Sequence, residues 1–191
     1  MTVVFETERL FLRHVTEADA EALLALDQDP EVTRYTGVGS LVLADHVERI
    51  RTVFLAQYAR NPRRGLFLAI EKASGDFVGW FIFRPATGHK MAAHIGWTRD
   101  DEIELGYRFR RSEWGRGLAT EGAAELVRDG LADPAVARVV AVALVTNGAS
   151  CRVLEKVGLA RTRTVALPGF DDPAAVFELN RVGRLVGGTF S

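Results

Sequence analysis

The sequence has little of what export, metal binding or membrane insertion requires. It contains one cysteine, Cys151, which excludes an internal disulfide, and its 4 histidines show no metal-ligand spacing. It has no run of about 20 apolar residues, and the N-terminus soon reaches charged residues, unlike a signal peptide. We therefore expect a cytoplasmic protein with no bound metal and no membrane segment.

Excess charge of one sign is also missing. The chain has 24 Lys and Arg residues against 25 Asp and Glu residues, a net charge of -1. No global field therefore attracts nucleic acid or an anionic membrane, and any anionic ligand must be held locally. With 191 residues, 48% of them hydrophobic, and no repeat, low-complexity segment or linker, the sequence predicts one domain over 1–191.

Hydrophobic periodicity and turn signals predict an α/β fold. The expected strands cover residues 5–13, 66–71, 77–83, 102–109, 138–145, 159–167 and 175–182. The first expected helix follows the capping pair Thr16 and Asp19 and ends at Asp29-Pro30; the others cover about 43–58, 116–132 and 150–157. Residues 85–101 are polar and without period, which indicates a long loop. This order is typical of a single mixed central sheet flanked by helices.

A glycine-rich turn follows the strand over 102–109 and opens the next helix: Trp114-Gly115-Arg116-Gly117-Leu118-Ala119-Thr120. The first amides of a helix have no intrahelical partner and carry partial positive charge, so they favour an anion. Gly115 and Gly117 leave room for a pyrophosphate to approach these amides. Nearby cations come from Arg110, Arg111 and Arg116.

The same glycines also fit a simpler role in a tight turn and in helix–sheet packing. Two other phosphate motifs are excluded. A dinucleotide fingerprint needs a third glycine where Thr120 stands, and a nucleoside-triphosphate loop needs Gly-Lys-Ser/Thr, which is absent.

Three blocks in this order resemble the GNAT acetyltransferase superfamily. They are Glu104-Leu-Gly-Tyr107, Glu113-Trp-Gly-Arg-Gly-Leu-Ala-Thr-Glu121 and Asn147-Gly-Ala-Ser-Cys-Arg-Val-Leu-Glu-Lys-Val-Gly-Leu159. The opening Thr7-Glu8-Arg9-Leu10 and the segment from Asp29 to Tyr35 are similar to the Rim-type branch of ribosomal-protein N-terminal acetyltransferases. An aromatic residue at the position of Trp114 is common in that branch. The resemblance spans most of the chain and implies the GNAT acyl-CoA N-acyltransferase fold.

The resemblance also implies where acetyl-CoA lies, between the strands over 102–109 and 138–145. Its pyrophosphate would meet the glycine turn, and its pantetheine chain would pair with the backbone near Phe109 and Arg111 and with Asn147. Asn147-Gly148 is also a simple turn signal. The residues expected to bind acetyl-CoA are Phe109, Arg111, Gly115, Arg116, Gly117, Leu118, Ala119, Thr120 and Asn147.

Acetyl transfer to an amine needs a neutral nucleophile and a hydrogen-bond donor near the departing thiolate. Glu104 matches an acidic strand position that serves as the base in parts of the superfamily, with Glu102 on the same face in reserve. Alternatively, Glu104 is a solvated edge charge or the ion-pair partner of Arg108. Many members place a donor tyrosine seven positions after the motif asparagine, where this sequence has Leu154. Ser150 is therefore the expected donor, or else the N-cap of the short helix.

Other residues have weaker signals. Trp80, Trp97 and Tyr35 either line an acceptor pocket or belong to the core. The loop over 87–101 is expected to shape specificity, and the turn carboxylates Asp171 and Asp172 are candidates for holding a cationic amine. Cys151 is interpreted as a small buried hydrophobe.

These features predict an acetyl-CoA-dependent N-acetyltransferase that acts by direct transfer on the amine of a small molecule or a protein N-terminus. Two alternatives stay open: a non-catalytic acyl-CoA-binding sensor, consistent with Leu154, and an acyltransferase that uses another donor such as succinyl-CoA. The acceptor and the oligomeric state, a homodimer included, are not determined by the sequence, because site features rather than the fold decide the substrate.

Overall fold

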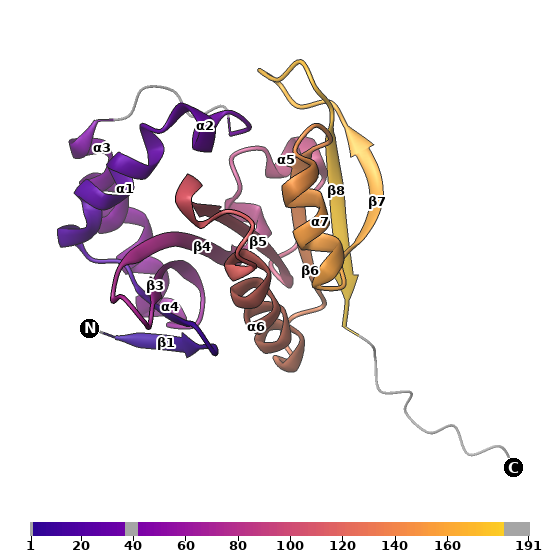
Figure 1. Ribbon diagram of the computed structural model, residues 1–191. Coiled ribbons are helices and arrows are strands. Elements are labelled where there is room, and N and C mark those ends of the chain that lie inside the picture. The colour runs from indigo at the N-terminus through magenta and orange to yellow at the C-terminus, as the bar shows by residue number, and fades with distance from the viewer. Residues whose placement is uncertain (1, 37–41, 182–191) are drawn as a thin grey trace, which may run out of the picture.

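The computed structural model describes residues 2–36 and 42–181 and contains one eight-stranded mixed sheet (Figure 1). The strand order is β1-β2-β3-β4-β5-β6-β8-β7. All neighbouring pairs are antiparallel except β5 and β6, which are parallel. The strands are β1 (Val3–Glu6), β2 (Leu10–His14), β3 (Gly65–Glu71), β4 (Phe77–Pro85), β5 (Glu102–Phe109), β6 (Arg138–Leu144), β7 (Ala160–Val165) and β8 (Ala174–Asn180). The predicted mixed sheet flanked by helices is confirmed.

The N-terminal strand predicted over 5–13 is wrong in its extent, because this segment forms the two strands of a hairpin, β1 and β2. Thr7 makes the turn: its backbone N–H donates to the Leu10 carbonyl at 2.9 Å, and its Oγ1 accepts from the Leu10 N–H at 3.0 Å. The turn is fixed to the rest of the fold by Glu121, whose Oε1 accepts from the Arg9 N–H at 2.7 Å. Two sequence blocks more than 100 residues apart therefore meet here.

The helices that follow are η1 (Glu17–Asp19), α1 (Ala20–Asp27), α2 (Pro30–Thr33), α3 (Leu43–Arg49), the π-helical turn η2 (Ile50–Phe54) and α4 (Leu55–Arg60). The capping pair is confirmed, because Asp19 Oδ2 accepts from the Thr16 N–H at 2.8 Å. Asp29-Pro30 does more than end a helix. Asp29 caps α2, with Pro30 in the first turn, a position where the missing proline N–H costs nothing.

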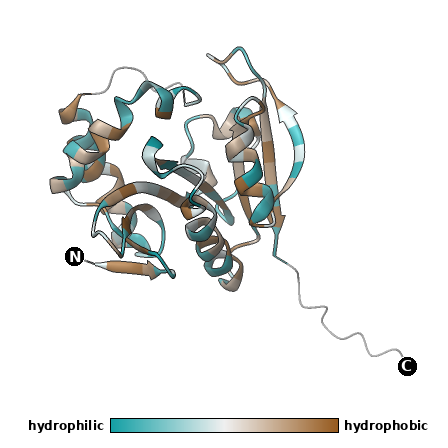
Figure 2. Cartoon of the chain, viewed as in Figure 1, coloured by the Kyte–Doolittle hydropathy of each residue, from teal (hydrophilic) through white to brown (hydrophobic). Residues whose placement is uncertain are grey.

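Helices cover both faces of the sheet. On one face, α6 (Leu118–Ala132) and α7 (Gly148–Lys156) pack on a core that includes Phe67, Phe81 and Leu105. On the other face, α1 and the helical segment over 43–60 cover a second core that includes Leu66, Leu68 and Ile82. Figure 2 shows hydrophobic residues along the central strands in brown and hydrophilic residues along much of α6 in teal.

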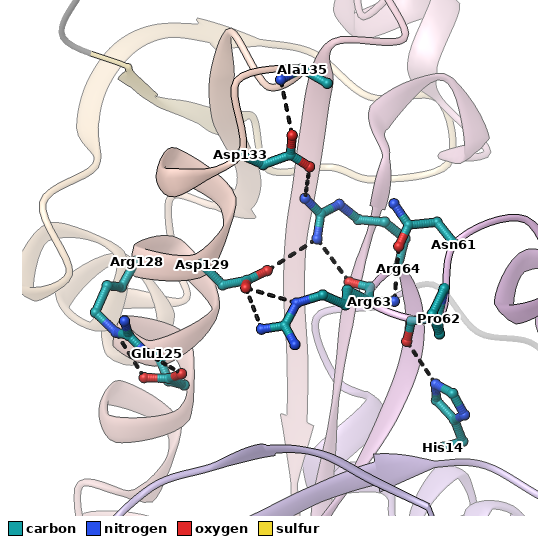
Figure 3. A network of polar contacts seen from close by, with 10 residues as sticks. All are labelled: His14, Asn61, Pro62, Arg63, Arg64, Glu125, Arg128, Asp129, Asp133 and Ala135. Carbon is teal, nitrogen blue, oxygen red and sulfur yellow. Dashed lines mark hydrogen bonds and ion pairs between the residues drawn. The ribbon is translucent and has the colours of Figure 1, made fainter.

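The far end of α6 is tied to the start of β3 by a network of ion pairs (Figure 3). Arg64, which is 5% exposed, donates to Asp129 Oδ2 at 3.2 Å and to Asp133 Oδ2 at 2.9 Å. Arg63 donates from Nε to Asp129 Oδ1 at 2.9 Å. The network therefore joins the C-terminal end of α6 to the residues just before β3.

Residues 85–101 are more ordered than the predicted long loop. They contain η3 (Ala86–Gly88) and α5 (Ala92–Ile95), and Trp97 is 1% exposed in a third apolar cluster over β6 and β8. A helix of four residues is too short to show a 3.6-residue period, so periodicity could not predict it.

The C-terminal half agrees with the sequence-based elements to within a few residues. The helix predicted over 150–157 begins at Gly148, because Asn147 caps it. The predicted end of the last strand, Val182, lies outside the described residues. Within residues 2–36 and 42–181, no helix has the length and apolar character needed to cross a bilayer.

Candidate active site

The candidate site lies where β5 and β6 part. The parallel register pairs Glu102 with Arg138, Ile103 with Val139 and Glu104 with Val140. Residues 102–144 are all described by the structure, and within them no other residues of β5 and β6 pair. From Leu105 to Phe109, β5 pairs with β4 alone. The backbone edge of this half of β5 is thus free for a ligand that pairs like a strand.

The glycine turn lies immediately after the free half of β5. It contains η4 (Arg111–Glu113), and Gly115 and Gly117 both have left-handed backbone, with φ of 77° and 81°. A Cβ on Gly115 would meet nothing within 4 Å, so close packing does not explain this glycine. Helix–sheet packing uses Gly122 and Gly130 instead, where a Cβ would meet Phe81 at 2.4 Å and Phe83 at 2.6 Å. Open space therefore lies beside Gly115, whereas the Arg9 guanidinium lies 3.5 Å from the place of a Cβ on Gly117.

The residues predicted to bind acetyl-CoA occupy different positions around this turn. Leu118 is buried, so only its backbone is available to a ligand, whereas Arg111 is exposed. Arg116 already pairs with Glu113 and Glu71. A hollow of about 380 Å³ lies beside the turn, and its lining residues are Ala25, Leu26, Asp29, Arg110, Arg111 and Ser112. Arg110 and Arg111 are therefore better placed than Arg116 to give an anion its cationic partners.

Phe109, at the end of β5, is 5% exposed, and its carbonyl accepts from Trp114 Nε1 at 3.0 Å. A carbonyl oxygen has a second lone pair, so this contact leaves capacity for one more donor. The Trp114 ring is 49% exposed, which is unusual for a large apolar side chain and places it on the rim of the turn.

Glu104 lies on the face of β5 that α1 and the helical segment over 43–60 cover, and it is 6% exposed. Its Oε2 accepts from Arg84 Nε at 3.0 Å, and its Oε1 lies 3.8 Å from His89 Nε2. Both simple alternatives for Glu104 are therefore wrong: it is not a solvated edge charge, and Arg108 is not its partner. Arg108 pairs with Asp27 of α1 instead.

His89 is the neighbour of Glu104 that the sequence did not single out. Burial lowers the pKa of His89, with Glu104 opposing and Arg84 adding to the shift, so the ring is neutral near pH 7. Its Nδ1 accepts from the Met91 N–H at 3.0 Å, which assigns the ring proton to Nε2, on the side of Glu104. A single histidine in a polar segment offered no sequence signal for this role.

Glu102, the reserve candidate for the base, is 1% exposed and pairs with Arg138, which also pairs with Glu178 at 2.6 Å. These ion pairs lie at the closed end of the β5–β6 ladder. Glu102 is therefore placed to hold the two strands together rather than to meet a substrate.

Ser150 and Asn147 lie at the start of α7, on the opposite face from Glu104. Asn147 is the N-cap, because its Oδ1 accepts from the Ser150 N–H at 3.1 Å, so the interpretation of Ser150 as the cap is wrong. The Ser150 Oγ instead lies 3.0 Å from the hydroxyl of Tyr107 on β5. Leu154, at the position of the family tyrosine, is 1% exposed.

The other candidates do not gather at one place. Trp97 and Tyr35 pack in the cluster over β6 and β8, whereas Trp80 packs with the helices on β3 and β4. Asp172 accepts from Thr146 Oγ1 at 2.9 Å, and Asp171 is exposed. Cys151 is half-buried, and burial raises the pKa of its thiol, which disfavours a nucleophilic thiolate. Within the described residues, no group of His, Cys, Asp and Glu side chains is arranged to hold a metal.

Comparison with known proteins identifies this arrangement. The sequence model of the family described as "Acetyltransferase (GNAT) domain" matches residues 9–160. The uncharacterized N-acetyltransferase YoaA of Bacillus subtilis is 31% identical over 160 residues, which cover 83% of each chain. FsC-acetyl coenzyme A-N(2)-transacetylase of Aspergillus fumigatus is 30% identical over 158 residues, or 83% of this chain, but the match spans only 65% of that relative's length.

Solved structures agree. The aminoglycoside acetyltransferase AAC(6')-Ib in complex with coenzyme A superposes with a TM-score of 0.71 at 25% identity, covering 89% of this chain and 94% of that one. A GNAT-family acetyltransferase from Bacillus anthracis has a TM-score of 0.74 at 22% identity, covering 95% of this chain and 99% of that one, which shows the shared fold. The parted strands and the open glycine turn fit the acetyl-CoA that this family uses, and the chain belongs to the GNAT acetyltransferases.

Proposed function

We propose that this acetyltransferase moves the acetyl group directly from acetyl-CoA to an amine, with Glu104 assisting deprotonation and Ser150 facing the departing thiolate. One observation carries the proposal. Where the β5–β6 ladder ends, Glu104 lies on one face of the sheet and the Ser150 hydroxyl lies over the other. The base acts on the amine nitrogen and the hydrogen-bond donor acts on the thioester sulfur. These two atoms are bonded to the acetyl carbon in different directions, so the two groups can reach them from different faces of the sheet.

The Glu104 side supports a base. Its Oε2 is held by Arg84, while its Oε1, 3.8 Å from His89 Nε2, is beyond a normal hydrogen bond and can accept a proton directly or through a water. His89 is neutral, and its ring proton is on Nε2, on the side of the carboxylate. The ring therefore presents no free lone pair on that side that would compete with Glu104 for the proton of the amine.

The cofactor side supports the expected acetyl-CoA contacts. The amides from Gly115 to Thr120 at the N-terminus of α6 would receive the pyrophosphate, with Arg110 and Arg111 beside them. The free edge of β5 near Phe109 would pair with the pantetheine chain. The Oδ1 of Asn147 is already occupied by Ser150, so its amide nitrogen is the group left to donate to a ligand.

The positive charges on the Glu104 face are matched by carboxylates. Arg84 pairs with Glu104, and Arg108 pairs with Asp27. Removal from water and the like charges of these two arginines lower the pKa of Arg49, and Asp27 opposes the shift. Asp45 acts on His46 beside the same groups. This balance does not select among amines, so we propose an acceptor with a free amine, as a small molecule or a protein N-terminus.

The test is acceptor-dependent release of CoA, followed by thiol detection. The panel contains short peptides with free N-termini, amino acids and other monoamines, and kanamycin, with acetyl-CoA or succinyl-CoA as the donor. We expect release with acetyl-CoA and a monoamine, and a loss of at least about 100-fold in the Glu104→Gln variant. Tight acetyl-CoA binding without release from any acceptor would replace this proposal with the sensor function. Faster release from kanamycin than from every peptide and monoamine would identify a polyamine as the acceptor and refute a monoamine acceptor.

Four further expectations from the sequence stay predictions. They are a single domain over 1–191, the likeness to the Rim-type branch, a cytoplasmic location and a homodimer. Sedimentation of the purified chain tests the last of these, and acetylation of a ribosomal-protein N-terminal peptide tests the second.

A further inference from the structure

Two hydroxyl groups join β5 to α7 across the parted strands. Tyr107 lies three residues beyond the last residue of β5 that pairs with β6, and its side chain packs in the core under α6 and α7. Its Oη is 3.0 Å from Ser150 Oγ and 3.0 Å from the Ser150 carbonyl oxygen. Both contacts go to the residue that faces the departing thiolate in the proposed reaction.

The number of protons in this pair limits its arrangements. The carbonyl of Ser150 only accepts, and each hydroxyl has one proton to donate. In one arrangement, Tyr107 donates to the carbonyl and Ser150 donates to Tyr107. In the other, Tyr107 donates to Ser150 Oγ, which leaves the serine proton directed to a third partner. Of these two, only the second keeps the hydrogen bond between the hydroxyl groups and also leaves the serine proton for a sulfur.

The position of this pair bears on Leu154. The resemblance to the superfamily implies a tyrosine there as the donor to the thiolate, but Leu154 has no hydroxyl and is buried. Ser150 lies one helical turn before Leu154 on α7. The chain has 3 tyrosines, and Tyr107 is the one that contacts this helix. A tyrosine hydroxyl is thus present at the start of α7, although it belongs to a residue of β5 and not to the helix.

We propose that Tyr107 is a positioning residue for the leaving group: it donates to Ser150 Oγ and so directs the serine proton toward the sulfur. The inference rests on the proposed function. As the amine nitrogen bonds to the acetyl carbon, the C–S bond breaks and its electron pair goes to sulfur. The amine proton goes to Glu104. Ser150 and Tyr107 keep their protons and stabilise the thiolate by hydrogen bonding.

The surroundings keep Tyr107 a donor over the useful pH range. Burial raises its pKa, the Ser150 hydrogen bond opposes this, and Cys151 on α7 adds to it. Cys151 is itself kept as a neutral thiol by burial. The charged groups Glu155, Arg161 and Arg152 act on Cys151, and the ring of Phe81 on β4 lies 6.1 Å from that of Tyr107. Tyr107 and Cys151 therefore keep their protons between pH 7 and 9. In this range, the group near Tyr107 and Ser150 that loses a proton is the thiol of bound CoA.

The experiment compares CoA with desulfo-CoA by calorimetry and needs no acceptor. A free thiol titrates near pH 8.5, so a donor pair aimed at the sulfur makes CoA bind progressively better than desulfo-CoA as the pH rises from about 7 to 9. We expect this preference to grow about tenfold in the wild type and to stay flat in Tyr107→Phe and in Ser150→Ala. Tyr58→Phe is the matched control, because Tyr58 is another buried tyrosine, whose hydroxyl bonds to the backbone of Leu66 and Val15. It should behave as the wild type.

The outcomes separate this inference from the proposed function. An undiminished pH-dependent preference in Tyr107→Phe would overturn the positioning role, even if the wild type binds CoA and turns over. Failure of the wild type to bind either nucleotide would instead overturn the cofactor site. Once an acceptor is known, Tyr107→Phe should lower kcat with little change in the KM for acetyl-CoA. A fall in melting temperature with unchanged kcat would show a structural role only.

Discussion

Two arginine–carboxylate networks at the central sheet differ in how many of their carboxylate oxygens have hydrogen-bond partners. At the far end of α6, Arg63 and Arg64 share Asp129, and Arg64 also holds Asp133, whose other oxygen accepts from the Ala135 N–H at 2.9 Å (Figure 3). At the parted strands, Glu104 has one arginine partner, Arg84, and its second oxygen lies 3.8 Å from His89.

The difference separates a structural network from a reactive one. A buried polar group that lacks a partner costs stability, so a fold completes such networks where nothing else is required of them. An oxygen with spare capacity is available to a substrate proton only where a substrate can reach it. Oε2 of Glu102 also lacks a hydrogen-bond partner, but it is buried at the paired end of the β5–β6 ladder, whereas Glu104 lies where the pairing ends. On this basis the Arg64 network should control stability, and Glu104 should control turnover.

The largest expected effect comes from Glu104→Gln. The amide keeps the shape and a hydrogen-bonding oxygen but cannot take a proton, so kcat should fall by roughly 10²–10⁴-fold. Steady-state CoA release measures it. The matched control is Glu102→Gln, a buried carboxylate on the same face of β5 that pairs with Arg138. Equal losses of kcat in the two variants would contradict the assignment of the base.

The second effect is on stability. Arg64→Met removes the guanidinium that joins Asp129 to Asp133, and we expect the free energy of unfolding to fall by about 3 kcal/mol, as for other broken buried ion pairs. Urea unfolding followed by fluorescence measures it. The kcat of the folded fraction should stay at the wild-type value. A large drop in kcat without a change in stability would reverse the comparison between the two networks.

Two glycines of the same backbone geometry sharpen the comparison. Gly115 and Gly75 both have a φ of 77°, and a Cβ on either would meet nothing within 4 Å. Each alanine variant should therefore lose about 1 kcal/mol of stability through left-handed strain. Only Gly115→Ala, in the turn before α6, should also raise the KM for acetyl-CoA, by about tenfold. Unchanged KM values in both variants would remove the turn from the cofactor site.

The smallest effect is a pH dependence of stability. The folded-state pKa of His89 is lowered by burial, so the folded state resists protonation and its stability is fully present above the ordinary histidine pKa of about 6.5. Stability should fall as the pH drops from 7 to 5, by at most about 1.4 kcal/mol per pH unit for one proton. His46 shifts in the same direction and adds its own share. Urea unfolding at several pH values measures this. The free energy of unfolding should depend less steeply on pH in His89→Gln than in the wild type. An unchanged slope would mean that His89 does not contribute.

The sequence predicted the parts of the fold that depend on local pattern. The alternation of β5, the long period of α6 and the capping pair Thr16 and Asp19 are all local signals, and each is confirmed. The β1–β2 turn was missed because hydrogen bonds from Thr7 make it, without a glycine or proline. Helix α5 was missed because four residues cannot show a helical period.

The candidate site was predictable only in its individual residues. The sequence indicated Glu104, Ser150 and the glycine turn, and their catalytic and binding roles stay predictions. Their partners depend on register: Arg84 lies opposite Glu104 on β4, and Tyr107 meets Ser150 from 43 residues away. No local sequence pattern predicts such contacts, because they depend on the register of the strands and on the position of the helix.

The short β5–β6 ladder has a mechanical consequence. Three paired positions join the five N-terminal strands to the three C-terminal ones within the sheet, and beyond them the two parts are held by the apolar core under α6 and α7. A cofactor that pairs with β5 and contacts α7 would add a connection between the two parts where strand pairing is absent. Amide hydrogen exchange along β6 and α7 should therefore slow when CoA binds, and the spacing between Glu104 and Ser150 would be set by the ligand as much as by the fold.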